Sequence, residues 1–377
     1  MPPKNPIRKS KVHRRRKKTT IVKKSGNCKS VLPKKNKLPL PEISGPPVHD
    51  VCYTWLLMKG DSYLPGIFVS VYSILRTNPN ADLVVMITPD VSEEAQEILL
   101  KVATHLFYVP YLTFNTNRLK TSKQNDLYSE WKSVSYTKWN MLALPYKKAV
   151  FLDGDTIATA NSDELFQLPT PAAPFNNPFV KPLGKIPDYL TGPRGPDRYL
   201  THGATVSQKN ISDIMNKHGM LLTASAVVLS PNFNDYDMYL NMVKQNQPYG
   251  KRTCHSMVDE QSIAEFYSQY KNKTWYNVHH RYNMIGWKHG FLSKGDVPKV
   301  IHYFSESKPW NMKYNEWEDV ICWYKMAAES LEYTQLRSSD IKLTDENIVG
   351  AKSAIDTFIK KHVSRDIDSI LDIANIE

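Results

Sequence analysis

The chain has 377 residues, of which 41% are hydrophobic and 11% aromatic, so it is long and apolar enough to form a globular protein with a sizeable core. Its formal net charge of +12 is uneven, because the first 40 residues hold 15 Lys and Arg and no acidic residue, whereas the rest holds 34 basic and 37 acidic residues. The body is therefore nearly neutral, and the positive net charge of the chain comes from its N-terminal tail.

The sequence lacks the long apolar runs of membrane proteins and the cysteine pairs of disulfide-stabilised proteins. No apolar run approaches the roughly 18 residues that a membrane helix needs, and no apolar stretch follows the N-terminal charges. Cys28, Cys52, Cys254 and Cys322 are far apart and form no CxxC pair, which argues against both a disulfide framework and a zinc site. We expect a cytoplasmic protein that is not secreted.

Residues 1–47 are rich in Lys, Arg and Pro and poor in core-forming residues, which predicts a disordered basic tail. The run Arg14-Arg15-Arg16-Lys17-Lys18 fits a nuclear localisation signal or a contact for an anionic polymer, and a solvated tail without a specific role is the alternative. Pro46-Pro47 marks the expected boundary with the body.

The first hundred residues of the body alternate between strand and helix patterns. Such alternation predicts a parallel sheet with right-handed crossovers. Ser92 is a suitable N-cap, and the acidic residues after it suit the positive end of a helix dipole. Apolar periodicity predicts strands at 51–58, 83–88 and 107–110 and helices at 66–75, 92–105 and 136–144.

A further apolar strand, 148–152, ends in Asp153-Gly154-Asp155. Two carboxylates held close together repel each other unless a cation lies between them, and a divalent ion with oxygen ligands is the usual solution. In open α/β sheets ligands bind outside the carboxyl ends of strands, which is where this pair would lie. Gly154 has no Cβ, so a phosphate or sugar could approach its backbone closely. A solvated turn is the alternative for these residues.

The second half of the body has a less regular pattern. Residues 169–201 contain eight prolines, which excludes regular structure and predicts a long loop that is either a lid or disordered. Further strands are expected at 223–229 and 300–304. Helices are expected at 235–244, 259–270 and 315–331, with another apolar helix face between 348 and 359.

Six stretches agree, in order, with one known family. The chain resembles the glycogenin-like, family-eight retaining glycosyltransferases over about residues 51–312, and from His202-Gly203 to Trp287 it is most similar to members encoded by large DNA viruses of insects. The matching stretches are Gly60-Asp-Ser-Tyr63-Leu-Pro-Gly66, Tyr136-Thr-Lys138-Trp139, Val150-Phe-Leu-Asp153-Gly-Asp155-Thr156, Asn161-Ser-Asp163-Glu-Leu-Phe166, Asp259-Glu-Gln261, and Val300-Ile-His302-Tyr-Phe304 followed by Lys308-Pro-Trp310-Asn311.

The resemblance implies an α/β fold, with a single GT-A-type nucleotide-sugar-binding domain at 48–312. Its central sheet would be mixed, mostly parallel and flanked by helices. A C-terminal helical extension, 313–377, would pack on this domain. The implied reaction moves a hexose, glucose or galactose, from a UDP-sugar to an acceptor hydroxyl with retention of configuration. The acceptor could be a glycan, a protein or a small molecule, and a homodimer is left open.

The resemblance also implies a manganese ion, with magnesium as a substitute, and a set of site residues. By matched position Asp153, Asp155 and His302 would be the metal ligands, while Lys138 and Lys308 would place point charges on the diphosphate. Other implied contacts are the backbone of Leu57 and the ring of Tyr63 for the uracil, Gly154 and Ser305 near the phosphates, and Glu260 or Gln261 near the anomeric carbon, with Asp259 beside them.

Three departures from the family pattern affect these expectations. Thr223-Ala224-Ser225 stands where the family often has Asn-Ser-Gly, so an amide contact to the donor sugar is missing. Ser305 replaces a glycine and could crowd the phosphate. No tyrosine occurs between Tyr282 and His302, which argues against glycogen self-priming at that position.

Two functions from other classes stay open at this point. Leu152-Asp153-Gly154-Asp155-Thr156 also fits the signature of haloacid-dehalogenase-like phosphatases, with Asp153 as nucleophile. Those enzymes need a later apolar strand that ends in a second acidic pair, whereas Gly295-Asp296 follows Ser293-Lys294 here. The third hypothesis is a non-catalytic binding protein that engages an anionic partner through its basic tail.

Overall fold

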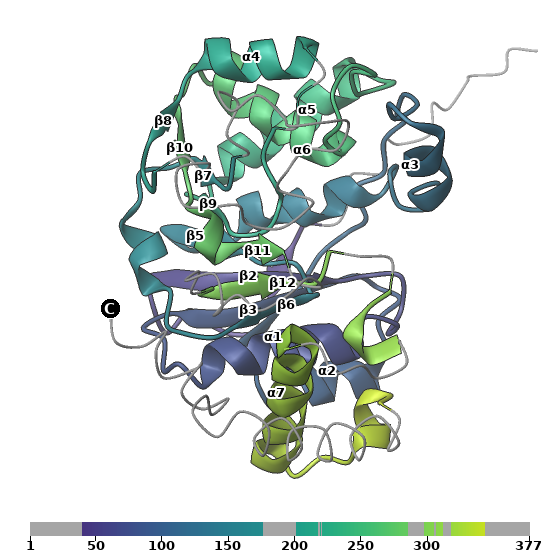
Figure 1. The fold of residues 1–377 in the computed structure, drawn as a ribbon, viewed down its shortest axis with the longest axis vertical. Helices are drawn as coiled ribbons and strands as arrows, with labels where there is room; N and C mark the ends of the chain where they lie inside the picture. Colours follow the sequence, from purple (N-terminus) through teal and green to yellow (C-terminus); the bar gives the residue numbers. More distant parts are fainter. Residues whose placement is uncertain are drawn as a thin grey trace, which may run out of the picture. The chain divides into compact units, whose positions relative to one another are not determined.

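The computed structural model describes residues 40–175, 201–217, 219, 221–285, 298–304, 307–311 and 318–343, which Figure 1 shows as a ribbon. The expected basic tail, most of the Pro-rich segment, Trp287, Ser305 and the helix near 348–359 lie outside the described residues. Residues 39–377 form one compact unit by themselves. Among the described helices, none combines the length and the apolar character that crossing a bilayer requires.

Four parallel strands form the N-terminal half of the main sheet, in the order β4, β3, β2, β5. They are β2 (Val51–Leu57), β3 (Asp82–Ile87), β4 (His105–Tyr108) and β5 (Lys148–Phe151). Nearly every residue in them is buried, because helices cover both faces of the sheet. The strands expected from the apolar runs are thus confirmed.

The remaining strands make the sheet mixed. β1 (Glu42–Ile43) pairs antiparallel with β4, and the strands beyond β5 are β9 (Val227–Leu229), β7 (Ala172–Ala173), β10 (Trp275–Asn277) and β8 (Thr205–Val206). Of these four, only β7 and β10 pair in parallel with each other. The expected α/β class with a mixed central sheet is confirmed, and parallel pairing predominates only among β2 to β5.

A second, three-stranded sheet positions the C-terminal site residues. β6 (Thr156–Ala158) directly follows the acidic motif and pairs antiparallel with β12 (Val300–His302), so that Thr156 lies opposite His302. β11 (Met284–Ile285) pairs in parallel with β12 on its other side. Residues that are about 150 positions apart in the sequence are therefore held next to each other by backbone pairing.

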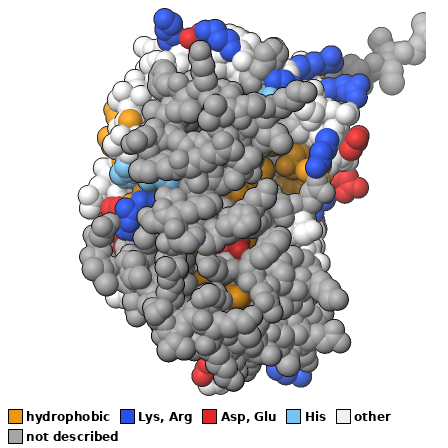
Figure 2. Space-filling view, in the orientation of Figure 1, with side chains coloured by type: hydrophobic (Ala, Val, Ile, Leu, Met, Phe, Trp, Pro, Cys, Tyr) orange, Lys and Arg blue, Asp and Glu red, His pale blue; other side chains and the backbone are white. Residues whose placement is uncertain are grey.

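Two helical layers cover the main sheet. In Figure 1, α1 (Leu64–Leu75), α2 (Glu93–Leu99) and α7 (Glu318–Thr334) lie together on one side, and α4 (Gln208–Asn216), α5 (Phe233–Gln245) and α6 (Val258–Glu265) lie on the other. Each layer has its own apolar core. Successive side chains of β2 point to opposite faces of the sheet, so Tyr53 and Trp55 lie in one core and Cys52 lies in the other. In the same orientation, Figure 2 shows Lys and Arg side chains on the edge near α4 and at the upper right, near α3 (Ser122–Leu127).

Several boundaries differ from the sequence predictions for local reasons. The helix expected at 92–105 begins at its predicted N-cap, where the backbone N–H of Ala95 donates to the Ser92 hydroxyl, but it ends at Leu99. The helix expected at 136–144 is a 3-10 helix, η1 (Ser135–Ala143). The strand expected at 223–229 begins only at Val227, because Ala226 has a left-handed backbone (φ 58°) and the N–H of Ala224 donates to a side chain.

The segment after residue 312 is described in part. α7 packs against α1, with Tyr333 beside Tyr72 and Glu329 3.4 Å from Arg76. This packing agrees with the expected helical extension, whereas the domain boundaries at 47 and 312 stay predictions.

Candidate active site

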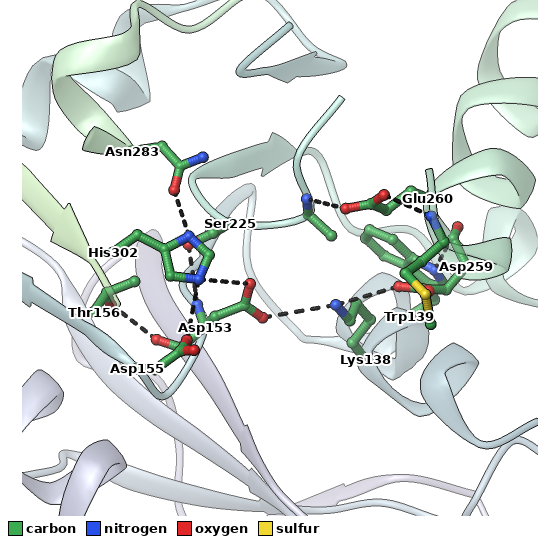
Figure 3. A network of polar contacts seen from close by, with 12 residues as sticks. Lys138, Trp139, Asp153, Asp155, Thr156, Ser225, Asp259, Glu260, Asn283 and His302 are labelled. Carbon is green, nitrogen blue, oxygen red and sulfur yellow. Dashed lines mark hydrogen bonds and ion pairs between the residues drawn. The ribbon is translucent and has the colours of Figure 1, made fainter. Parts of the chain in front are cut away.

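The acidic motif lies at the carboxyl end of β5, in the turn that leads to β6. The N–H of Asp153 donates to the Ser225 hydroxyl (3.2 Å), and the hydroxyl of Thr156 donates to the carbonyl of Asp153 (2.8 Å). Figure 3 shows Ser225 and Thr156 beside this turn. The backbone of the turn is thereby fixed at Asp153.

His302 completes a cluster with the two aspartates. Its Nε2 lies 3.2 Å from an oxygen of Asp155 and 3.9 Å from an oxygen of Asp153. One ligand atom from each of the three residues lies within 4.8 Å of the others, which is a spacing that a single metal ion can bridge. The His302 side chain is 3% exposed, and those of Asp153 and Asp155 are 27% and 10% exposed, so the cluster opens to solvent on the Asp153 side.

Asn283 orients His302, and nothing in the sequence pointed to it. The amide oxygen of Asn283 lies 2.8 Å from Nδ1 of His302 (Figure 3). Since an amide oxygen can only accept, Nδ1 is the donor in this contact, and Nε2 is the nitrogen that faces the carboxylates. Metal-ligating histidines usually have such an outer partner. Asn283 immediately precedes β11, and its proximity depends on the pairing of β11 with β12.

Lys308 and Lys138 neutralise the acidic residues. The Lys308 ammonium lies 2.5 Å from Asp155 and 2.9 Å from the carbonyl of Tyr303. The Lys138 ammonium lies 3.6 Å from Asp153 and 3.2 Å from Asp259. Burial alone would raise the pKa of Asp155, but Lys308 and His302 outweigh it and hold that pKa below its ordinary value. Burial would likewise lower the pKa of Lys138, but the neighbouring carboxylates raise it.

These groups line a pocket of about 870 Å³. One wall is aromatic, because the ring of Tyr63 contacts Trp131 and Trp310 edge-on at centroid distances of 5.8 and 5.3 Å. Burial and the nearby aspartates raise the pKa of the Tyr63 hydroxyl. α3 contributes Lys123 to the pocket, and the start of α6 contributes Asp259.

The three residues expected near the anomeric carbon have different surroundings. Asp259 is 1% exposed and lines the pocket, and its Oδ1 has no hydrogen-bond partner among the described residues. Glu260 also lines the pocket, but its two oxygens accept the N–H groups of Ala224 (3.0 Å) and Met257 (2.9 Å). Burial and Asp259 raise the pKa of Glu260 to about 8. Gln261 points away, hydrogen-bonded to the backbone at 251 and 256.

Three other expected contacts differ in detail. Leu57 is buried, its carbonyl accepts the N–H of Thr88, and its neighbours Leu56 and Met58 line the pocket instead. Gly154 lines the pocket, yet a Cβ there would meet Ile67 at 2.5 Å, so close packing against α1 already requires a glycine. Ser305 lies outside the described residues.

Comparisons with known proteins identify the family of this chain. Residues 56–313 match the model of the family described as Glycosyl transferase family 8, and the chain belongs to that family. The expected resemblance is thereby confirmed, and we set the phosphatase alternative aside.

Among curated proteins, the chain is 29% identical over 267 residues to the uncharacterized protein R707 of Acanthamoeba polyphaga mimivirus, covering 69% of this chain and 82% of that protein. It is 28% identical over 261 residues to human glycogenin-2, covering 69% of this chain but only 43% of glycogenin-2. The likeness to proteins of large DNA viruses is thus confirmed, whereas the finer expectation of insect viruses stays a prediction.

Among solved structures, the apo structure of the bifunctional glycosyltransferase WbbM aligns with 77% of this chain and 52% of that chain, at 18% identity and a TM-score of 0.46.

Proposed function

We propose that this family-eight glycosyltransferase transfers glucose or galactose from a UDP-sugar to an acceptor hydroxyl, with retention of configuration and in the presence of Mn²⁺. The observation that carries the proposal is the cluster of Asp153, Asp155 and His302 in a pocket that also presents two lysines and an aromatic wall.

The donor set of the cluster suits a divalent metal ion. Asp153 and Asp155 supply oxygen ligands and His302 supplies Nε2, while Asn283 holds the other ring nitrogen. An imidazole ligand favours Mn²⁺ over Mg²⁺, which prefers an all-oxygen set. When bound, the ion would act as a Lewis acid that stabilises negative charge on the leaving diphosphate.

The protein's own residues would bind and orient the donor. Lys138 and Lys308 lie at the cluster, so each would place a point charge near a diphosphate oxygen. The Tyr63 ring lies in the pocket wall, where it would contact the uracil. Asp259 Oδ1 lacks a hydrogen-bond partner among the described residues, so it would accept a bond from a hydroxyl of the transferred sugar.

In the transfer itself, the acceptor oxygen forms a bond to the anomeric carbon. The bond from that carbon to the β-phosphate oxygen breaks, and its electron pair leaves with UDP. The acceptor proton passes to the departing phosphate. The contacts of Glu260 favour this front-face route over a covalent intermediate on that residue, because both of its oxygens already accept backbone N–H groups.

The test is UDP release from UDP-glucose and UDP-galactose, with and without Mn²⁺, together with calorimetric titration of UDP. We expect Mn²⁺-dependent release and binding in the wild type, and loss of both in Asp155→Ala. Asp213→Ala, which removes an exposed carboxylate on α4, is the matched control and should behave as the wild type. Anomeric proton NMR of the product then tests retention. Absence of both turnover and Mn²⁺-dependent UDP binding in the wild type would overturn the proposal.

A further inference from the structure

Two loops that are distant in sequence, 113–125 and 247–257, lie side by side next to the pocket. The N–H of Tyr249 donates to the carbonyl of Asn115 (2.9 Å), and the N–H of Asn117 donates back to the carbonyl of Tyr249 (2.8 Å). The Gln124 amide donates to the carbonyl of His255 (2.9 Å). Backbone and side-chain hydrogen bonds therefore join the loops into one ridge.

The ridge is basic throughout. Neither loop contains an Asp or Glu, and together they carry five Lys and Arg and one His. We call these residues the basic rim: Arg118, Lys120, Lys123, Lys251, Arg252 and His255. In Figure 2, Lys and Arg side chains gather at the upper right, on the side where Figure 1 places α3.

Four of the five Lys and Arg side chains of the basic rim have no carboxylate partner among the described residues. Within the described ranges, Arg118, Lys120, Lys251 and Arg252 make no ion pair with a carboxylate, unlike Lys138 and Lys308 inside the pocket. The ammonium of Lys120 instead lies 2.8 Å from Nε2 of His255, where it donates to an imidazole. Burial lowers the pKa of Lys120. Unbalanced like charges repel one another, and an anion bound between them would relieve the repulsion.

The basic rim is continuous with the pocket. Lys123 and, at the end of the second loop, Met257 line the same cavity as Asp153 and His302. The diphosphate of the donor is already matched by the metal cluster with Lys138 and Lys308, so the rim supplies positive charge beyond what the donor requires. Of the rim's cations, Lys123 lies at the pocket itself.

We propose that the basic rim binds an anionic group of the acceptor, so that the acceptor is a saccharide carrying a phosphate or a carboxylate. This inference rests on the proposed transferase function and names the acceptor class for that site. The anionic group takes no part in the bond changes; it anchors the acceptor while a separate hydroxyl reacts.

The test compares three probes that share one ring, namely glucose, glucose 6-phosphate and glucuronate. Calorimetry measures their binding to the full-length protein loaded with UDP and Mn²⁺, so the result does not depend on turnover. The rim variant is Arg118→Gln/Lys120→Gln/Arg252→Gln. The double variant Arg118→Gln/Arg252→Gln changes only exposed side chains, and it replaces the triple variant if that one folds poorly. The matched control, Lys101→Gln/Lys209→Gln/Lys244→Gln, removes three exposed charges from outside both loops.

We expect both anionic probes to bind the wild type more tightly than glucose, and raised salt to weaken them. The rim variant should lose at least about tenfold in affinity for them, because each removed charge contributes a factor of about two to five. The control should lose nothing, and UDP binding should be unchanged in every variant. Equal affinity for all three probes, or an equal loss in the control, would overturn the inference. Absence of Mn²⁺-dependent UDP binding in the wild type would instead overturn the transferase function.

Discussion

Asn283 favours the tautomer of His302 that has its proton on Nδ1. Without its amide oxygen, the imidazole could carry its proton on Nε2 and donate to Asp155, which lies 3.2 Å away. That tautomer cannot bind a metal ion through Nε2. Asn283 is therefore a positioning residue that acts through His302.

We predict that Asn283→Ala weakens Mn²⁺ binding about 10- to 100-fold, the usual effect of losing an outer-shell partner. Electron paramagnetic resonance titration of Mn²⁺ in the presence of UDP measures it. Asn140→Ala is the matched control, since Asn140 is also buried but bonds to Pro110, Thr137 and Tyr236 and to no residue of the cluster. It should lower stability and leave Mn²⁺ affinity unchanged. Equal affinity losses in both variants would assign Asn283 a purely structural role.

Glu260 makes stability depend on pH. Its pKa in the folded protein, about 8, lies above the ordinary value of 4.5. The folded state therefore binds this proton more tightly than the unfolded state, so the contribution is complete below about pH 4.5 and is lost as the pH rises through 8.

We predict that the wild type loses on the order of 4 kcal/mol of unfolding free energy between pH 5 and 9 relative to Glu260→Gln, which has no titrating group at this position. Urea unfolding at several pH values measures the difference. Glu97→Gln, an exposed change on α2, should keep the pH dependence of the wild type. Parallel curves for wild type and Glu260→Gln would show that Glu260 is ionised throughout.

The site residues differ in how far the sequence reveals them. Asp153 and Asp155 follow from local chemistry, because two acids after an apolar strand imply a cation. His302 and Lys308 could be placed only through the family resemblance, since their distance in sequence from the motif is bridged by β-pairing. Asn283 could not be predicted, because an asparagine before a two-residue strand has no local signature.

Among the elements, α1 fixes the acidic turn by close packing. A Cβ at Gly66 would lie 2.4 Å from Cη2 of Trp310 and 2.6 Å from the carbonyl oxygen of Gly154. The helix backbone thus approaches the turn as closely as two glycines permit. In the sequence, Gly66 belongs to a family motif, and Gly154 marks a place where a phosphate could approach the backbone. The structure shows that both positions require glycine because the helix packs closely on the turn.

We predict that Gly66→Ala lowers stability by about 1–3 kcal/mol, as overpacking typically does, because neither the indole nor the backbone carbonyl can yield easily. It should also weaken Mn²⁺-dependent UDP binding, since the displaced carbonyl lies between Asp153 and Asp155. Thermal unfolding and calorimetry measure the two effects. In the control, Gly45→Ala, the new Cβ meets only the ring of His105 at 3.2 Å, so both effects should be small.

The fold was predictable where elements are long and buried. β2, β3 and β5 read as apolar runs, and α2 begins at its predicted cap. The two- and three-residue strands β7, β8, β10 and β11 were not predicted. They are too short to show an apolar alternation, and their pairing depends on partners elsewhere in the chain. The end of α2 and the late start of β9 were likewise decided by tertiary contacts.

At the scale of the whole molecule, the charge is divided into two parts. Residues 1–39 carry all 15 basic residues of the tail, and the rest has a formal net charge of −3. The basic rim is thus a local feature of a nearly neutral body, and it is separate in sequence from the tail. Two anion-binding activities can therefore be distinguished by deleting one and neutralising the other.

We predict that a variant beginning at residue 40 keeps the melting temperature and the UDP and glucose 6-phosphate affinities of the wild type, but loses salt-sensitive binding to a 20-base-pair DNA duplex. The physical reason is counterion release, which scales with the number of phosphates that Lys and Arg neutralise. Fluorescence anisotropy across a salt series measures it.

Replacing only the run from Arg14 to Lys18 with glutamine should remove part of the salt dependence, because five of the 15 charges are lost. The rim variant should show the opposite pattern, with DNA binding retained and glucose 6-phosphate binding weakened. If deleting the tail left DNA binding intact, the body itself would hold the polyanion site, and the rim would be the first place to seek it. If the deletion weakened UDP binding, tail and catalysis would be coupled, and the division of charge would not correspond to a division of function.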